Sequence, residues 1–169
     1  MDSETSHNRK QTSGATKNIW YACYGSNLNR DRFMRYIVKC LDKTSPLDDQ
    51  PFILPYPLYF AQHSSRWGGG VAFIGLKPMN DTRTYSRVYK ITEDQFRDVI
   101  SKENNNKPFQ LDLNEVIAKG SIIIDADWRY GRIIYLGEKQ STPVFTFTAP
   151  NDIGDYSQTR PSQKYIDTI

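Results

Sequence analysis

Residues 21–28, with the sequence Tyr-Ala-Cys-Tyr-Gly-Ser-Asn-Leu, constrain the fold more than any other part of the chain. A short apolar run breaks at a glycine, and residues 30–41 then have the pattern of a helix. A strand that turns at once into a helix leaves backbone N–H groups without partners near the positive end of the helix dipole. Such a turn suits a carboxylate, a phosphate or an oxyanion. The same pattern also fits a tight turn that binds nothing, and spacing alone does not separate the two.

The residues of this turn have the chemistry that a binding loop needs. Gly25 lets the backbone approach a ligand closely or adopt a positive φ. Ser26 can donate a hydroxyl hydrogen and Asn27 an amide hydrogen. Asn29 is a suitable N-cap for the helix. The apolar residues at helical spacing predict one buried stripe along it: Phe33, Met34, Ile37, Val38 and Leu41.

The length and composition predict one folded domain. A chain of 169 residues can bury a sizeable core, and its 22 aromatic residues argue against disorder. Residues 1–18 are polar throughout, so we expect a flexible tail there and a folded domain at residues 19–169. No apolar run approaches the roughly 20 residues that span a bilayer, and no secretory signal is recognisable. The expected protein is soluble and cytoplasmic, with no membrane partner.

The chemistry-bearing residues exclude several classes of site. Cys23 and Cys40 are expected to be free buried thiols of a reducing compartment. Only two histidines are present, with no cluster of cysteine and histidine, so no metal site is predicted. The net charge of +3 is small and the basic residues are scattered among acids, so nucleic acid is not an expected partner.

The remaining pattern predicts a strand-rich domain. Strands are expected at residues 19–24, 85–91, 120–124, 132–136 and 144–148, and the β-branched segments 120–124 and 132–136 are expected to be buried. Residues 52–60 contain two prolines, which predicts an edge or interrupted strand. Residues 107–116 read as a polar insert without regular structure, and residues 155–160 as a loop.

Three consecutive glycines precede a β-rich segment at residues 71–74. Glycine in a strand costs conformational entropy. Gly69 and Gly70 therefore indicate a place where another backbone segment or a ligand approaches closely. A β-bulge is the alternative, and the two interpretations are compatible.

A capped helix places one acid on an apolar face. Thr92 and Gln95 form a capping box, and the helix is predicted to end near Glu103, where asparagines tolerate a left-handed backbone. Glu103 falls on the same stripe as Phe96, Val99 and Ile100. A carboxylate among apolar neighbours has a raised pKa or a dedicated partner, and is a candidate general base. Periodicity alone equally allows the last turn to expose it to water.

Four features in this order resemble the gamma-glutamylcyclotransferase-like family: Tyr-Gly-Ser-Asn-Leu, Gly-Gly-Val-Ala, a Glu at the end of the capped helix, and Pro-Ser-x-x-Tyr at residues 161–165. The resemblance implies an α+β fold built on a small mixed β-barrel or strongly curved sheet with flanking helices. It implies that Glu103 is catalytic. It also implies the following substrate-binding residues: Tyr24, Gly25, Ser26, Asn27, Leu28, Gly69, Gly70 and Tyr165.

Enzymes of this family release 5-oxoproline from gamma-glutamyl compounds. The resemblance implies that Glu103 takes a proton from the substrate amine and returns it to the leaving amine, while the loop amides hold a carboxylate or an oxyanion. It implies no cofactor, a small-molecule gamma-glutamyl substrate, and a monomer or homodimer. The leaving group stays open.

Two departures from the family pattern affect the region around the predicted base. Asn104 stands where the family usually has Gly, and Val99-Ile100 replaces a common Leu-Asp. The sequence also ends at Ile169, where family members usually continue, so either the protein is shortened or its final helix lies outside this sequence.

Two other functions remain open. The first alternative is a non-catalytic member of the same fold that binds a small acidic metabolite or a peptide end. A basic protein acting on nucleic acid is a third reading, supported only by the isoelectric point of about 8.8.

Overall fold

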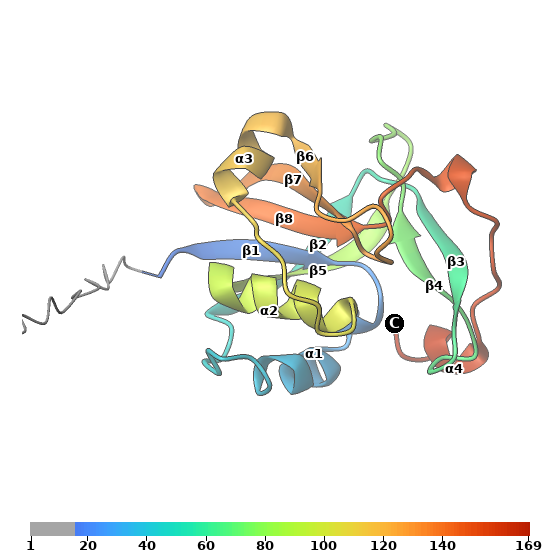
Figure 1. Cartoon of the computed structure of the whole chain (residues 1–169), viewed down its shortest axis with the longest axis horizontal. Helices are drawn as coiled ribbons and strands as arrows, with labels where there is room; N and C mark the ends of the chain where they lie inside the picture. Colours follow the sequence, from blue (N-terminus) through green and yellow to red (C-terminus); the bar gives the residue numbers. More distant parts are fainter. Residues whose placement is uncertain (1–15) are drawn as a thin grey trace, which may run out of the picture.

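The computed structural model describes residues 16–169, which form two sheets flanked by helices (Figure 1). Of the predicted tail at residues 1–18, residues 1–15 lie outside the described residues. The strands are β1 (Asn18–Cys23), β2 (Asp48–Leu54), β3 (Leu58–Ser64), β4 (Gly69–Ile74), β5 (Thr84–Thr92), β6 (Ser121–Ile123), β7 (Arg132–Lys139) and β8 (Thr142–Thr148). The helices are α1 (Arg30–Ile37), α2 (Glu93–Glu103), α3 (Leu113–Lys119) and α4 (Gln163–Ile166), with short 3₁₀ helices η1 (Ser26–Leu28) and η2 (Ile153–Asp155).

Strand β1 lies inside the larger sheet, whose order is β2-β5-β1-β8-β7-β6. It pairs antiparallel with β5 and parallel with β8. Because side chains alternate between the faces of a strand, β1 supplies two cores. One contains Ile19, Tyr21 and Cys23, and the other contains Trp20, Ala22 and the following Tyr24.

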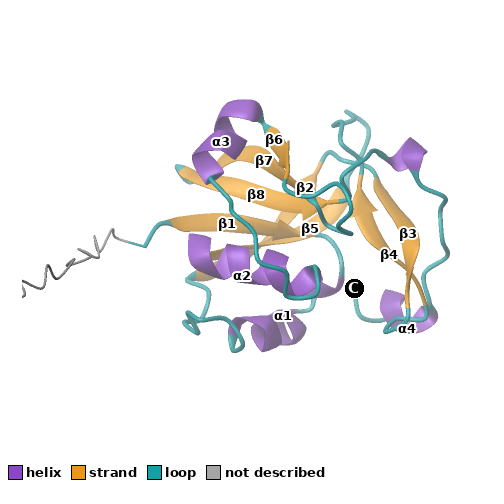
Figure 2. Cartoon of the chain, viewed as in Figure 1, coloured by secondary structure: helices purple, strands orange, loops and turns teal. Residues whose placement is uncertain are grey.

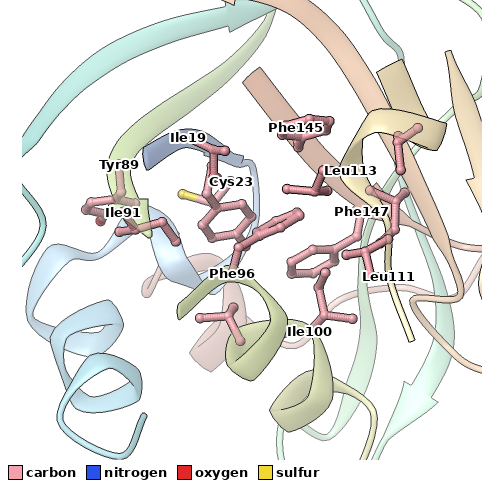
Figure 3. Close-up of a cluster of buried hydrophobic side chains, with 14 of the residues drawn as sticks. Ile19, Cys23, Tyr89, Ile91, Phe96, Ile100, Leu111, Leu113, Phe145 and Phe147 are labelled. Carbon is pink, nitrogen blue, oxygen red and sulfur yellow. The ribbon is translucent and has the colours of Figure 1, made fainter. Parts of the chain in front are cut away.

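The first core is covered by α1, α2 and α3 (Figures 1 and 3). Phe96 and Ile100 of α2 lie beside Phe145 and Phe147 of β8, as Figure 3 shows. Helix α2 begins with the predicted capping box, in which both hydrogen bonds between Thr92 and Gln95 are present. The end of α2 is also as predicted, since Asn105 and Asn106, just after Glu103, adopt positive φ. Helix α2 therefore begins and ends where the sequence predicted, with Glu103 as its last residue.

The second core lies between the other face of the sheet and the β3–β4 hairpin, which Figure 2 shows apart from the larger sheet. The prolines act as predicted: β2 is an edge strand that contains Pro51, and Pro55 and Pro57 separate it from β3. Residues 158–162 run beside this hairpin, with hydrogen bonds from Thr159 N–H to the Phe60 carbonyl and from Gly70 N–H to the Arg160 carbonyl.

The α+β class is confirmed, but the implied barrel is not. In residues 16–169 the strands form an open six-stranded sheet and a separate two-stranded sheet, and no pairing closes them. The sheet edges explain this. Strand β6 has three residues and pairs only with β7, whereas β2 carries a proline that cannot donate a hydrogen bond.

Several local predictions were wrong. Helix α1 ends at Ile37 rather than at residue 41, so Val38 and Leu41 are exposed instead of completing the stripe. Residues 113–119 form α3, capped by Asp112, within and beyond the segment predicted to be irregular. Strand β6 is only partly buried, because it lies at a sheet edge, and β1 begins at Asn18 inside the predicted tail. Within the described chain, no helix combines the length and apolar character required to cross a membrane.

Candidate active site

The glycine turn directly follows β1 and leads through η1 into α1. Gly25 has φ of −118°, so a left-handed backbone does not require glycine here. The need is for space, because a Cβ at this position would lie 2.9 Å from the Tyr165 hydroxyl. Tyr165 is buried, and its hydroxyl accepts a hydrogen bond of 3.1 Å from the Ala72 backbone N–H. The Tyr-Gly pair of the loop is thus packed directly against the last helix.

Fewer loop amides are free than the sequence predicted. The Leu28 N–H donates to the Gly25 carbonyl at 2.9 Å, and Leu28 packs against the first core. Burial raises the pKa of Tyr165, and the backbone amides of Ala72 and Ser26, which are directed at its hydroxyl, oppose this shift. Leu28 is therefore removed from the predicted binding set, because the turn of η1 consumes its amide.

Asn27 joins the loop to the end of α2. Its buried side-chain amide donates to Glu103 Oε1 at 3.4 Å and to the Tyr21 hydroxyl at 3.3 Å. The Tyr89 hydroxyl donates to its backbone carbonyl at 2.8 Å. The Asn27 Oδ1 atom is buried without a hydrogen-bond partner in the described residues. An unpaired buried acceptor beside a carboxyl is unusual, and it is available to a donor on a ligand.

Glu103 is the last residue of α2, is half-buried, and lines a cleft. Burial raises the pKa of its carboxyl, while a hydrogen bond from Tyr36, the charge of Arg32 and the Asn27 amide partly offset the shift. A carboxyl with a raised pKa can take up and release a proton closer to neutral pH than an exposed one.

Two connected cavities meet at this carboxyl. The inner one, here called the recess, has a volume of about 30 Å³ and is lined by Tyr24, Gly25 and Asn27 among others. The larger one, here called the cleft, has a volume of about 620 Å³. Four residues line both: Ser26, Glu103, Tyr130 and Tyr165. The recess has room for about one water molecule, so a larger ligand would occupy the cleft.

Gly69 and Gly70 lie elsewhere. A Cβ on Gly69 would be 2.7 Å from the Arg160 carbonyl oxygen, and one on Gly70 would collide with Thr159. Neither glycine lines the recess or the cleft. Of the two partners expected near these glycines, a backbone or a ligand, it is a backbone, and their assignment to substrate binding is not supported by their position.

Two residues of the cleft were not predicted, although their spacing in the sequence indicates that they share a helix face. Arg32 and Tyr36 are four residues apart on α1, so they share a helix face, and both line the cleft. The prediction for this helix rested on its apolar stripe, which lies on a different face from Arg32 and Tyr36.

Asn104 explains one departure from the family pattern. Its side chain donates to the Tyr130 carbonyl and accepts from the Tyr130 N–H, both at 3.1 Å. This double hydrogen bond fixes the turn at residues 128–131, and the Tyr130 hydroxyl in turn donates to the Ala72 carbonyl at 3.2 Å. Tyr130 is thereby held across the mouth of the recess, a role that no local sequence signal predicts.

The two cysteines are free and buried, as expected. In residues 16–169, no group of three or more His, Cys, Asp or Glu side chains is placed to hold a metal ion.

Comparisons with known proteins find similarity in sequence to a curated protein and similarity in fold to solved structures. No protein-family model matches the chain. It is 32% identical over 157 residues to Histone deacetylase 5 of Arabidopsis thaliana, a match of 79% of this chain and 24% of that protein. The chain thus spans about a quarter of the length of this relative.

Two solved structures match most of the chain. A gamma-glutamyl cyclotransferase superposes with a TM-score of 0.54 at 15% identity, and an uncharacterized protein from Homo sapiens superposes with a TM-score of 0.53 at 16% identity. Each match covers 90% of this chain and 76% of the other.

Proposed function

Because the chain has the fold of gamma-glutamyl cyclotransferase, as its motifs predicted, we propose that it is a cyclotransferase that releases 5-oxoproline from a gamma-glutamyl amine or amino acid. The single observation that carries this proposal is the position of Glu103. One carboxyl with a raised pKa lies within 3.4 Å of the Asn27 amide, at the floor of a cleft that also reaches Ser26. The residues 19–169 would then be one catalytic domain.

The reaction needs one group that acts first as a base and then as an acid. The substrate ammonium must lose a proton before its nitrogen attacks the γ-carbonyl carbon, and the leaving amine must gain one as the amide bond breaks. Glu103 would take the first proton and supply the second. A raised pKa suits both steps, because the carboxylate is a stronger base and the carboxylic acid remains available near neutral pH.

The loop would hold the negative charges of the substrate. The backbone amides of Gly25 and Asn27, with the Ser26 hydroxyl, would bind the α-carboxylate or the developing oxyanion, and Tyr24 and Tyr165 would shape the recess. Ring closure is intramolecular, so holding the γ-glutamyl chain in a folded conformation supplies much of the rate. The steps require only these side chains and amides.

The direct test is the substitution Glu103→Gln, which keeps the shape of the side chain and removes its charge. We expect 5-oxoproline release to fall about a thousandfold, in the range for loss of a general base. The matched control is Glu138→Gln, at an exposed glutamate on β7. Turnover by Glu103→Gln equal to that of the control would show that the base is another residue.

A second function is favoured by the small recess and by the basic residues of the cleft. In it, the chain binds a small acidic metabolite or a peptide end without turnover. The two are separated by incubating the unmodified protein with a panel of gamma-glutamyl amino acids and amines. Formation of 5-oxoproline supports the enzyme, and binding without 5-oxoproline supports the binding module.

A further inference from the structure

The outer part of the cleft carries more charge than the proposed reaction uses. The term "outer cleft" here denotes the part lined by Arg66, Trp67, Lys102, Lys107, Trp128 and Arg129. We propose that the outer cleft selects gamma-glutamyl compounds whose leaving group bears additional negative charge, and rejects cationic leaving groups. This inference rests on the proposed function.

Positive charge exceeds negative charge along the lining. The basic side chains of the cleft are Arg32, Arg66, Lys102, Lys107 and Arg129, whereas its carboxyls are Glu103 at the floor and Asp127 at the exposed rim. The histidine of the lining, His63, is exposed at the same rim. A cleft lined by one sign of charge raises the local concentration of ligands of the opposite sign.

In the described residues these basic groups form no ion pair with a carboxylate, although the charges of Arg32 and Arg66 lower the pKa of Glu103. Arg129 donates instead to neutral acceptors, the Gln62 side chain at 3.3 Å and the His63 carbonyl at 3.0 Å. Arg32 has a buried Nε atom without a hydrogen-bond partner in the described residues. The positive charges of the cleft are therefore available to attract an anionic ligand.

Aromatic rings hold the cations at two places in the cleft. The guanidinium of Arg32 lies 4.8 Å from the Trp67 ring and that of Arg66 lies 5.8 Å from it. The ammonium of Lys107 lies 5.5 Å from the Trp128 ring. Stacking on a ring restricts a long basic side chain without neutralising it, so less conformational entropy is lost when an anion binds.

The geometry assigns these cations to the leaving group. Glu103 and Ser26 line both the recess and the cleft, so a γ-glutamyl group that reaches them has its reacting amide at the inner end of the cleft. Whatever is bonded to the γ-carbonyl then extends toward Arg66 and Lys107. A carboxylate there meets unpaired cations, whereas an ammonium meets like charge.

Three dipeptides of nearly equal size test the inference: γ-glutamyl-glutamate, γ-glutamyl-glutamine and γ-glutamyl-lysine. The glutamate and glutamine compounds have nearly the same shape and differ in the charge of one side chain, whereas the lysine compound carries a longer, cationic side chain; all three share the γ-glutamyl group and the α-carboxylate of the leaving group. We expect kcat/KM for 5-oxoproline release to fall in this order, by about tenfold at each step in low salt, and the differences to shrink as salt is added. Equal values for the glutamate and lysine compounds would overturn the inference while leaving the proposed function intact.

A double variant locates the effect. Arg66→Gln with Lys107→Gln should reduce the preference for γ-glutamyl-glutamate over γ-glutamyl-lysine by at least about tenfold, with a smaller change for γ-glutamyl-glutamine. The control is Lys77→Gln, at an exposed lysine after β4 that does not line the cleft. An unchanged preference in the double variant would overturn the assignment to the outer cleft.

Binding measured without turnover separates the two proposals. Calorimetric titration of the Glu103→Gln variant with the three dipeptides should give the same order of affinity. If the unmodified protein releases no 5-oxoproline from any of them but this order of binding holds, the proposed reaction fails and the charge selection stands. If the order is absent in both binding and turnover, the charge selection fails.

Discussion

The recess and the outer cleft meet at Glu103 but are built in opposite ways. The recess is lined by tyrosines whose hydroxyls bond to backbone groups: Tyr24 to the Phe147 carbonyl at 2.6 Å, Tyr130 to the Ala72 carbonyl, and Tyr165 to the Ala72 N–H. The outer cleft is lined by long basic side chains that are partly or fully exposed and belong to no ion pair in residues 16–169.

This difference separates two tasks. Buried hydroxyls that are already bonded cannot move, so the recess can fix the position of one carboxyl and of the loop amides. Exposed cationic side chains can adjust to several ligands, and salt screens their charge. The outer cleft can therefore select among substrates without holding any of them in one position. A change in the recess should therefore affect the rate for every substrate, and a change in the outer cleft should affect the ranking of substrates.

After Glu103→Gln, the largest effect is expected from Gly25→Val. The new side chain would collide with the Tyr165 hydroxyl, which lies 2.9 Å from a Cβ at this position. Because Tyr165 is buried and bonded to Ala72, we expect the loop to shift and 5-oxoproline release to fall at least about a hundredfold for all substrates. Unchanged substrate affinity and rate would remove the loop from the site.

A compensating change sharpens this test. The double variant Gly25→Ala with Tyr165→Phe removes the hydroxyl that the added methyl group meets. We expect it to be more active than Gly25→Ala alone, because contacting residues are not additive. Additive losses would mean that the two side chains act independently.

The next effect is on stability and depends on pH. Burial raises the pKa of Glu103, so over a range above its ordinary pKa the folded protein holds a proton that the unfolded chain has released. The free energy of unfolding that Glu103 contributes is therefore present at low pH and lost as pH rises through the folded pKa. Glu103→Gln cannot ionise, and its stability relative to the unmodified protein should grow from pH 4 to pH 8.

Urea unfolding at several pH values measures this difference, with Glu138→Gln as the exposed control. A difference that does not change with pH would show that the Glu103 carboxyl is as well solvated in the folded protein as in the unfolded chain.

The smallest effect is expected from Tyr36→Phe. The Tyr36 hydroxyl lowers the pKa of the Glu103 carboxyl, so its removal should move the acidic limb of the kcat/KM profile to higher pH. We expect a loss of about threefold to tenfold at pH 5.5 and of less than about twofold at pH 8.5. Tyr85→Phe, at an exposed tyrosine on β5, is the matched control. A uniform loss at both pH values would indicate that Tyr36 is needed only for packing.

The local parts of the fold followed from the sequence. The capping box of Thr92 and Gln95 fixed the start of α2, and the spacing of Phe96, Val99 and Ile100 predicted the face on which Glu103 lies, where it is half-buried. These predictions depend on residues three or four positions apart, so local geometry is sufficient. The same reasoning failed for Leu41, because apolar spacing continued after the helix had ended.

The non-local parts of the site did not follow from the sequence. Gly69 and Gly70 were correctly expected to be approached closely, but only the structure shows that the approaching group is the backbone of residues 159–162. Tyr130 is brought to Glu103 by the side chain of Asn104, across 26 positions. Which segment packs against a given residue depends on the topology of the whole chain. The residues on one side of a contact do not specify the residues on the other side.

The strand that leads into the loop has no free side. Residues 19–24 are all buried, three in each core, so a bulkier or smaller side chain at any of them disturbs packing in one of two directions. Strands of antiparallel sheets commonly present every second side chain to solvent, where a substitution disturbs packing less. Residues 19–24 have no such exposed positions, so the geometry of the turn depends on the packing of both cores. Substitutions at these six positions should therefore disturb the turn most, although only Tyr21 and Tyr24 among them line the recess.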